Sequence, residues 1–295
     1  MTTLSELRAP PDPRVHWDLP PFGAMPTVTV LGEQVVRVLA PNPSPMTLDG
    51  TNTYVLGTSG SGTAVLVDPG PDTADHLATV EEVLATRDAE PAAIVVTHHH
   101  VDHAEAAATW AARFGCRVVA STPAVAGPGG RVVADGDRLA VGDLDLEVVA
   151  TPGHTRDHVA LRLPDGALLT GDHVLGRGTS VVAYPDGDLT AYLASLRKVL
   201  DLGPSRLLPG HGPELDEDPG AVLRYYRDHR AFREQQILTV LAQGPATPRE
   251  LVAVIYAEVD RQLWSAAEAS TRAALAALVE HEQVRVDADD RAHLR

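Results

Sequence analysis

The chain has 295 residues, 44% of them hydrophobic, and its formal net charge at pH 7 is −16. This length predicts two domains with a substantial core, and no stretch approaches the roughly 18 apolar residues that a membrane span needs. The single cysteine, Cys116, excludes a disulfide framework within the chain and is expected to be a core residue, while the negative charge disfavours long-range attraction of nucleic acids.

Residues 1–24 are rich in proline, and we expect them to form an N-terminal arm that is poorly ordered or laid over the surface. They contain no apolar run of the roughly 7 to 15 residues that an export signal requires. We therefore expect a cytoplasmic protein with no membrane partner.

Residues 25–215 alternate strand-like and helical patterns, as is typical of an α/β domain. Helices are predicted at Thr73–Thr86, Asp102–Phe114 and Leu189–Leu202. Short β-branched, apolar runs predict strands at Thr27–Leu39, Thr53–Leu56, Thr63–Val67, Ala92–Val96, Arg117–Ala120, Asp145–Ala150, His158–Leu163 and Ala167–Thr170. One more strand is expected before His211.

The run Thr97–His103 reads T-H-H-H-V-D-H and follows one of these strands directly. In an extended segment His98 and His100 point to one side and His99 to the other, so we expect His99 not to bind metal. Asp102 and His103, at the start of the next helix, can face a second ion. A chance surface cluster of histidines is the alternative interpretation of this run taken alone.

Three later segments argue against that alternative, because each places a His or Asp beside glycine after an apolar run. They are Thr151–Thr155 with His154, Leu169–His173 with Asp172, and Leu208–Gly212 with His211. Glycine lets the backbone approach closely where a loop presents a ligand at the end of a strand.

A change of pattern occurs at Gly212–Gly220, an acidic connector rich in proline and glycine, so we expect a second domain at residues 216–295. Helices are predicted at Ala221–Leu241, from the capping box at Thr247 to about Glu258, and at Leu263–Glu280. Val284–Val286 and Ala292–Leu294 then predict a hairpin. Three helices and a terminal hairpin indicate a small helical winged-helix domain.

The ordered motifs H-x-H-x-D-H, His, Asp and His resemble those of metallo-β-lactamase-fold hydrolases. The resemblance implies a four-layer αββα sandwich over residues 25–215 and a site for two ions. His98, His100 and His154 would hold the first ion, Asp102, His103 and His211 the second, and Asp172 would bridge them. Imidazole and carboxylate ligands suit two Zn²⁺ ions best, with Mn²⁺ or Fe possible.

Such a pair of ions, roughly 3.5 to 4 Å apart, lowers the pKa of a bridging water from about 15.7 toward about 7 and so provides hydroxide at neutral pH. Hydrolysis is the expected reaction, and Asp102 and Asp172 are the predicted catalytic carboxylates. The family implies that Asp68 orients the histidine loop, with a turn residue as the alternative. His158 and His173 are candidates for holding substrate or donating a proton, with structural hydrogen bonds as the alternative. Arg177 is the candidate for binding an anionic substrate group.

Several relatives are excluded by these residues. Secreted β-lactamases require an export signal and often use Cys where this chain has Asp172. Flavodiiron proteins carry Glu in place of His100. Three segments, Asn42–Tyr54, Gly171–Thr179 and His229–Leu238, resemble the β-lactamase-like protein 2 group, whose members are associated with single-stranded RNA cleavage and with thioester hydrolysis on acyl carrier proteins.

The charges argue against RNA as the substrate. Residues 218–295 hold ten arginines against twelve Asp and Glu residues, and the wing tip Asp287–Asp290 is acidic. DNA binding is therefore not expected, and the winged helix is expected to pack, to form a homodimer or to wall the active-site cleft. On helix Ala221–Leu241, Arg224, Arg227, Arg230 and Arg233 either meet phosphates at the cleft or remain solvated or ion-paired.

The sequence thus predicts a metal-dependent (dizinc) hydrolase of an ester, thioester or phosphodiester, acting on a small-molecule or acyl-carrier substrate. One alternative is an endoribonuclease specific for single-stranded RNA. Another is a mono-iron persulfide dioxygenase-like oxidoreductase, which could use the same H-x-H-x-D-H loop.

Overall fold

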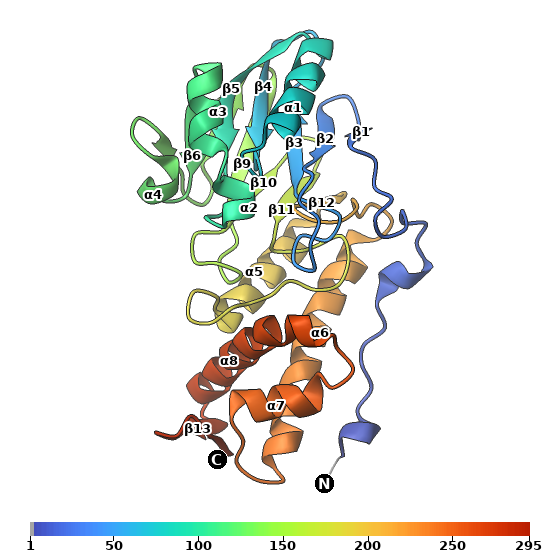
Figure 1. Cartoon of the computed structure of the whole chain (residues 1–295), viewed down its shortest axis with the longest axis vertical. Coiled ribbons are helices and arrows are strands. Elements are labelled where there is room, and N and C mark those ends of the chain that lie inside the picture. The colour runs from blue at the N-terminus through green and yellow to red at the C-terminus, as the bar shows by residue number, and fades with distance from the viewer. Residues whose placement is uncertain (1–2) are drawn as a thin grey trace.

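The computed structural model of the chain describes residues 3–295. Two β-sheets pack face to face in one half of the molecule, and the C-terminal helices form the other half (Figure 1). The first sheet runs antiparallel from β1 to β4 and parallel from β4 to β7. Its strands are β1 (Val28–Val30), β2 (Val35–Leu39), β3 (Asn52–Leu56), β4 (Gly62–Val67), β5 (Ala89–Val95), β6 (Arg117–Ala120) and β7 (Arg131–Val132).

The second sheet has five strands, in the order β12-β11-β10-β9-β8. Only the pair β11 and β12 is parallel; the other neighbours are antiparallel. The strands are β8 (Arg138–Val141), β9 (Leu144–Ala150), β10 (Val159–Arg162), β11 (Leu168–Gly171) and β12 (Leu207–Pro209).

Neighbouring side chains of the central strands point to opposite faces of the first sheet, so one apolar run contributes to two hydrophobic cores. Val95 of β5 faces the second sheet and shares the inner core with Val67. Its neighbour Ile94 faces the opposite way and packs with Leu66 and Trp110 in the outer core, beneath the helices of the first sheet. Both faces of the sheet are therefore buried, as a continuous apolar strand requires.

Helices cover the outer faces of both sheets. Over the first sheet lie α1 (Ala74–Thr86) and α3 (Ala107–Phe114), with the short helices α2 (Val101–Ala104) and α4 (Pro123–Ala126) nearby. Over the second lies α5 (Leu189–Leu202), whose N-cap Asp188 accepts a hydrogen bond from the Ala191 N–H. The expected αββα sandwich is thereby confirmed.

Two predicted elements were wrong in extent. The single strand expected over Thr27–Leu39 is a hairpin, β1 and β2, because the chain reverses at Gly32, which has a φ of 140°. The single helix expected over Asp102–Phe114 is divided into α2 and α3, because the Ala106 N–H donates to the Gly70 carbonyl instead of to a carbonyl of α2. Strands β7 and β8 and helix α4 were not predicted.

The C-terminal part consists of α6 (Pro219–Leu241), α7 (Pro248–Ile255), α8 (Trp264–Glu280) and the hairpin of β13 (Val284–Val286) and β14 (Ala292–Leu294). The capping box of Thr247 and Glu250 is present at the start of α7. Helix α7 ends at Ile255, three residues before the predicted Glu258, and a 3₁₀ turn (Arg261–Leu263) leads into α8. This is the expected winged-helix arrangement.

The two expected domains share a hydrophobic core. Leu168 of β11 and Leu196 of α5 belong to the same buried cluster as Val222 of α6 and Leu275 of α8. The connector Gly212–Gly220 contributes Leu215 to this cluster and is exposed only at residues 216–218, so the two parts are joined inside. None of the helices within residues 3–295 combines the length and apolarity needed to cross a membrane.

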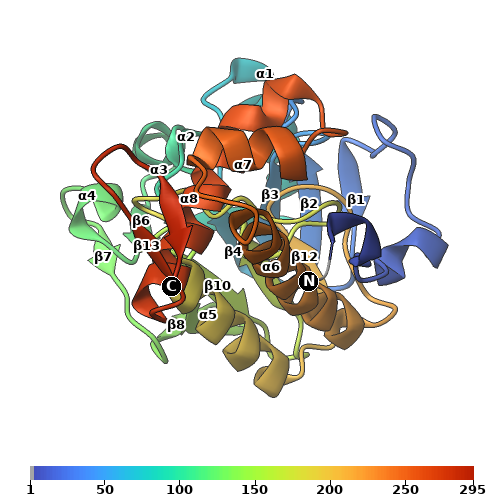
Figure 2. The ribbon, with the colours of Figure 1, turned by 90° about the horizontal axis from the view of Figure 1, so that it is seen from below.

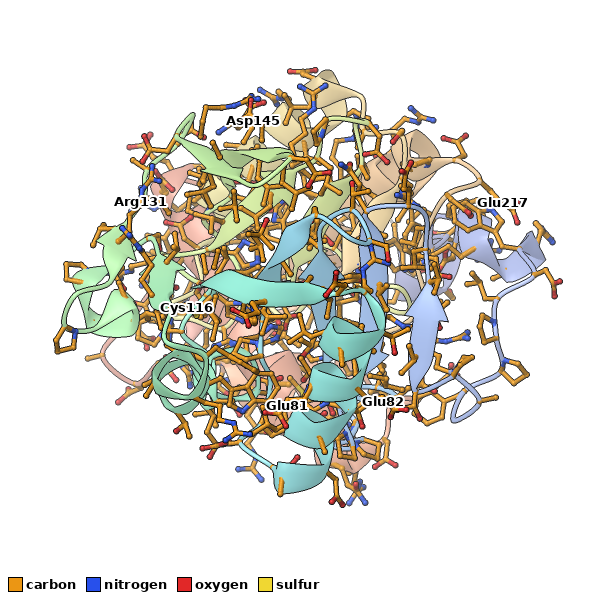
Figure 3. All side chains as sticks on the ribbon, turned by 90° about the horizontal axis from the view of Figure 1, so that it is seen from above. Glu81, Glu82, Cys116, Arg131, Asp145 and Glu217 are labelled. Carbon is orange, nitrogen blue, oxygen red and sulfur yellow. The ribbon has the colours of Figure 1, made fainter. Side chains whose placement is uncertain are left out.

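The N-terminal arm runs along the outside of the molecule toward the C-terminal helices, and its start lies beside α6 (Figure 2). It carries two 3₁₀ turns, Leu4–Glu6 and Pro13–His16. The second is anchored by Arg14, which is 5% exposed. At the opposite end of the molecule, Cys116 (Figure 3) is half-buried and packs against the outer core, so it lies at the margin of the core and not within it as expected.

Candidate metal centre

The seven predicted ligands meet on loops that follow the strands of both sheets. The loop after β5 leads through His98 and His100 into α2, which carries Asp102 and His103. His154 follows β9, Asp172 follows β11 and His211 follows β12. In Figure 1 this region lies between the sheets and the C-terminal helices, at the level of α2.

Four of these side chains form a first cluster. The Nε2 atoms of His98 and His154 lie 3.0 and 3.1 Å from the Nδ1 atom of His100. Asp172 Oδ2 lies 3.6 Å from His154 Nε2 and 4.0 Å from His98 Nε2. Ligand atoms around one tetrahedral zinc ion would be about 3.3 Å apart, so the spacing fits a single small cation.

The second cluster contains Asp102, His103 and His211. His211 Nε2 lies 3.2 Å from both Asp102 Oδ2 and His103 Nε2. Asp172 Oδ1 lies 3.4 Å from the Nε2 atoms of His103 and His211. The two oxygens of Asp172 thus face different clusters, which is the arrangement expected of a carboxylate shared between two cations.

Asp172 Oδ1 is also buried without a hydrogen-bond partner among residues 3–295. A buried carboxylate oxygen without a donor is costly, and a cation would remove that cost. The donor set, five imidazoles and two carboxylates, is one that zinc accepts. The residues present therefore fit a pair of divalent cations.

Hydrogen bonds behind the histidines direct their Nε2 lone pairs into the centre. His103 Nδ1 donates to Asp68 Oδ2 at 2.9 Å, His154 Nδ1 to the Val181 carbonyl at 2.6 Å, and His211 Nδ1 to the Gly50 carbonyl at 3.1 Å. With its Nδ1–H committed outside, each ring turns Nε2 toward the centre, where that atom can bind a cation once it carries no proton.

Asp68 organises the loop after β5. Its Oδ1 accepts a hydrogen bond from the Thr97 N–H and its Oδ2 one from the Thr97 hydroxyl, both at 2.8 Å. The Thr97 oxygen lies 3.0 Å from His98 Nδ1 and can accept a hydrogen bond from its N–H. Asp68 thus contacts His103 directly and His98 through Thr97, which is the orienting arrangement that the resemblance implies.

The three histidines of the first cluster are neutral before any cation binds. Burial lowers the pKa of His98 well below its usual range, and burial together with His154 lowers the pKa of His100 to about 4. Burial likewise lowers the pKa of His154. These rings are therefore ready to coordinate at neutral pH without losing a proton.

The second cluster has the opposite electrostatics. Burial opposes protonation of His211, but Asp172 and Asp102 outweigh it and raise the pKa of His211 to about 9. Burial also opposes protonation of His103, yet Asp172 and Asp68 raise its pKa well above the usual value. In the absence of a cation, His103 and His211 are therefore protonated at neutral pH. A cation that binds the second cluster must compete with these protons for the ring nitrogens.

Glycines beside the ligands allow the close packing. A Cβ atom on Gly210 would lie 2.7 Å from the His103 ring and 2.8 Å from Asp172 Oδ1, inside the candidate centre. A Cβ on Gly171, which has a φ of 46°, would lie 2.7 Å from both His158 Nε2 and Thr97 Oγ1. These contacts give a physical reason for glycine at the strand ends.

The remaining candidate residues lie around the two clusters. His99 points away, with Nδ1 2.9 Å from Asp157 Oδ1, and its side chain is 46% exposed. His158 Nε2 accepts a hydrogen bond from the Asp172 N–H at 3.1 Å, and its Nδ1 donates to the Thr151 hydroxyl. These contacts position the Asp172 backbone.

His173 and Arg177 follow Asp172 on the same loop. His173 is fully buried against Tyr192, with a ring separation of 4.8 Å, and neither ring nitrogen has a hydrogen-bond partner within residues 3–295. Arg177 lines a cavity beside the candidate centre. Sequence reasoning missed Thr97 and the carbonyls of Gly50 and Val181. Thr97 stands inside the motif, but a carbonyl acceptor leaves no side-chain signal.

Comparisons with known proteins agree with this geometry. Residues 46–211 match the metallo-beta-lactamase superfamily, and residues 247–292 match the beta-lactamase associated winged helix domain. A beta-lactamase-like protein 2 homolog from Drosophila melanogaster is 38% identical over 279 residues, which cover 89% of this chain and 93% of that protein.

Two further similarities concern a relative and a solved structure. An atrochrysone carboxyl ACP thioesterase from Aspergillus fumigatus is 33% identical over 255 residues, covering 79% of this chain and 76% of that protein. A beta-lactamase domain protein from Burkholderia ambifaria has the same fold, with a TM-score of 0.80 at 22% identity, over 100% of this chain and 99% of that one.

Proposed function

This chain belongs to the metallo-beta-lactamase superfamily and is a metallo-hydrolase of that fold, and we propose that it hydrolyses an ester or thioester bond with two zinc ions. The observation that carries the proposal is the position of Asp172, whose two carboxylate oxygens face the two ligand clusters. Bound in such a pair, divalent cations polarise the carbonyl under attack and supply a nucleophilic water at neutral pH.

The side chains of this chain take the following parts. His98, His100 and His154 would hold one cation, Asp102, His103 and His211 would hold the other, and Asp172 would contact both. Asp102 Oδ2 is the carboxylate oxygen suited to accept the proton of the attacking water, because the Asp102 side chain is 30% exposed whereas that of Asp172 is 12% exposed. Burial raises the pKa of Asp102, but His211 and His103 outweigh it and keep the group ionised.

Thioesters are favoured over RNA for two reasons. A relative that aligns with 79% of the chain is named a thioesterase, which supports acyl transfer to water as the reaction. The net charge of −16 opposes the approach of a polyanion at long range, whereas an acyl thioester of small size carries little charge. Single-stranded RNA cleavage and a mono-iron oxidation remain the competing functions for the experiment below.

The test combines metal analysis with a substrate panel. The purified protein is expected to hold two zinc ions per chain and to hydrolyse acyl thioesters or aryl esters in preference to simple phosphodiesters and single-stranded RNA. Asp172→Ala should lose bound metal and retain less than about 1% of the turnover. Asp145→Ala serves as the matched loss of a carboxylate, because Asp145 of β9 is exposed on the outside of the molecule (Figure 3) and is none of the seven candidate ligands.

Each alternative has its own signature. One iron per chain, with oxygen consumption on a persulfide, would replace the proposal by the oxidoreductase. RNA cleavage without turnover of any ester or thioester would replace it by the ribonuclease. Full turnover in Asp172→Ala would show that the reaction does not depend on the shared carboxylate.

A further inference from the structure

A cavity of about 400 Å³ lies between the loop that follows Asp172, the segment around Met46 and the C-terminal helices. Two of its lining residues touch the candidate metal centre. The Val181 carbonyl accepts the hydrogen bond from His154 Nδ1, and the Ser180 hydroxyl donates to the Asp172 carbonyl. The cavity therefore borders the segments that carry His154 and Asp172.

One wall of the cavity is cationic. Arg177 and Arg233 both line it, and neither has a salt-bridge partner within residues 3–295, although the chain has 40 acidic residues against 24 basic ones. The Nε and Nη2 atoms of Arg177 and the Nε atom of Arg233 are buried without a hydrogen-bond acceptor in that same range. Buried guanidinium donors without acceptors indicate a place where an anion completes the hydrogen bonding.

The neighbouring residues of α6 keep this wall in place. Arg230 is 7% exposed, donates to the Ser180 carbonyl and lies 5.1 Å from the centre of the Tyr192 ring. Its Nε atom is likewise buried and unpaired among the described residues. Burial, with Arg230 and Arg233 beside it, lowers the pKa of His229 to about 3, so this ring is neutral at pH 7 and one of its nitrogens can donate.

Only two of the four regularly spaced arginines of α6 line the cavity. Arg224 and Arg227 are exposed and pair with Asp218 and Asp228. Arg230 and Arg233, one and two turns further along, face the cavity instead. The four arginines that recur every third residue therefore divide into a solvated, ion-paired pair and a cavity-lining pair.

Another part of the lining is apolar and comes mainly from the winged-helix part. Tyr256, Val259 and Leu263 line it together with Met46 and Leu48. The guanidinium of Arg233 lies 4.4 Å from the centre of the Tyr256 ring, which fixes its orientation by stacking. A cavity with one apolar wall and one cationic wall fits a ligand that carries a hydrocarbon part and an anionic group.

We propose that this cavity recognises the anionic group, a phosphate or a carboxylate, of a substrate that also has an apolar part, with Arg177 and Arg233 as its principal contacts. The proposal rests on the function proposed above and names the class of its substrate. It also assigns a role to the winged-helix part, whose residues Tyr256, Val259 and Leu263 form the apolar wall of the substrate site. Arg fits both anions because its planar fork can donate two parallel hydrogen bonds.

The first experiment compares substrates that differ only in the anion. For phosphate the pair is the acetyl thioester of 4′-phosphopantetheine and that of pantetheine. For carboxylate it is the succinyl and the butyryl thioester of N-acetylcysteamine. At least one anionic member should exceed its neutral partner in kcat/KM by about tenfold or more, mainly through KM. Equal kcat/KM values within both pairs would overturn the proposal, while the absence of any thioester hydrolysis would contradict the proposed function instead.

The variants test the assignment to residues. Arg177→Gln and Arg233→Gln should each reduce the anionic preference by roughly 10- to 100-fold, which corresponds to the loss of hydrogen bonds to a charged group. Arg177→Lys should restore part of it because the charge is retained. Arg227→Gln removes the same charge from the exposed face of α6 and should leave the preference unchanged. An unaltered preference in both cavity variants would refute the assignment.

A binding measurement keeps the two proposals separable. Calorimetry on metal-free protein with 4′-phosphopantetheine, pantetheine and succinate requires no catalysis and no metal. Wild type should bind an anionic ligand more tightly than pantetheine, and Arg177→Gln should weaken binding of that anionic ligand by about tenfold or more. This result supports the cavity assignment even if the enzyme catalyses another reaction. The same affinity for phosphorylated and unphosphorylated pantetheine, without succinate binding, would contradict it.

Discussion

The guanidinium of Arg14 donates a hydrogen bond to the carbonyl oxygen of Leu175 at 2.9 Å and so joins the N-terminal arm to the loop that follows Asp172. It also donates to the Gly178 carbonyl at 2.6 Å and lies over the rings of Tyr225 and Tyr226. One side chain therefore connects the arm, the loop carrying Arg177 and helix α6.

We predict that Arg14→Ala lowers the free energy of unfolding by about 3 kcal/mol, because two loop carbonyls lose their buried donor. It should also raise KM, since the loop with Arg177 loses an anchor. Urea unfolding monitored by circular dichroism measures the first effect. Arg8→Ala, which removes an exposed arginine of the same arm, should stay within about 0.5 kcal/mol of the parent. Equal stabilities of the two variants would contradict the anchoring role.

Several elements could be predicted from the sequence because local pattern and tertiary contact agree there. Helix α5 and the hairpin β13–β14 were predicted with the bounds that the structure shows. Strands β7 and β8 were missed because β7 is exposed at both residues and β8 buries only Leu139, so neither carries an apolar run. The break before Ala106 depends on the Gly70 carbonyl, far away in sequence, and no local pattern records it.

The positions of the seven candidate ligand residues were predictable because each stands in a short motif at the end of a strand. The structure brings all seven together. The cavity beside them was not predictable, since its walls come from Met46, Arg177, Arg233 and Tyr256, which meet only through the packing of the C-terminal helices on the second sheet. The sequence indicated Arg177 as a residue that could bind an anion. It gave no reason to choose Arg233 for that role over the other arginines of α6.

A second prediction concerns Asp68, which accepts three hydrogen bonds from Thr97 and His103. Asp68→Asn should weaken metal binding by roughly 10- to 100-fold, because one acceptor oxygen becomes an NH₂ group that faces donors. Asn is the suitable replacement, since Asp68 has a φ of 50° and Asn tolerates that conformation.

Competition with a coloured chelator measures the affinity for zinc in Asp68→Asn. Asp72→Asn provides the control, because Asp72 is exposed four residues further along the same loop. Parental zinc affinity in Asp68→Asn would show that the histidine loop holds its geometry without this carboxylate.

Neighbouring histidines offer a sharper test of the candidate centre. His100 Nδ1 lies among the atoms of the first cluster, whereas His99 pairs with Asp157 outside it. We predict that His100→Ala lowers the zinc content by about one ion per chain and that His99→Ala leaves it unchanged. Atomic absorption on dialysed protein decides between them. A zinc loss in His99→Ala equal to that in His100→Ala would contradict the side-chain directions described above.

The last prediction concerns acid stability and His76, which is 1% exposed. Its Nε2 atom lies 2.8 Å from the Thr53 hydroxyl, and its ring packs 5.4 Å from that of Trp110. Burial lowers the pKa of His76 to about 4, below the value of about 6.5 expected in the unfolded chain. The folded state therefore binds fewer protons between these two values, and stability is lost as the pH falls.

Because the pKa of His76 is lower in the folded state, neutral His76 makes its full contribution to the free energy of unfolding above about pH 6.5. This contribution decreases as the pH falls toward 4. At pH 5 the linkage corresponds to about 2 kcal/mol of lost stability. We predict that metal-free wild type loses about 2 kcal/mol more than His76→Gln between pH 7.5 and pH 5.0, measured by urea unfolding at both values. Using the difference between the two proteins cancels the titration of the other histidines, which both share. Equal losses in the two proteins would show that His76 does not remain neutral in the folded state.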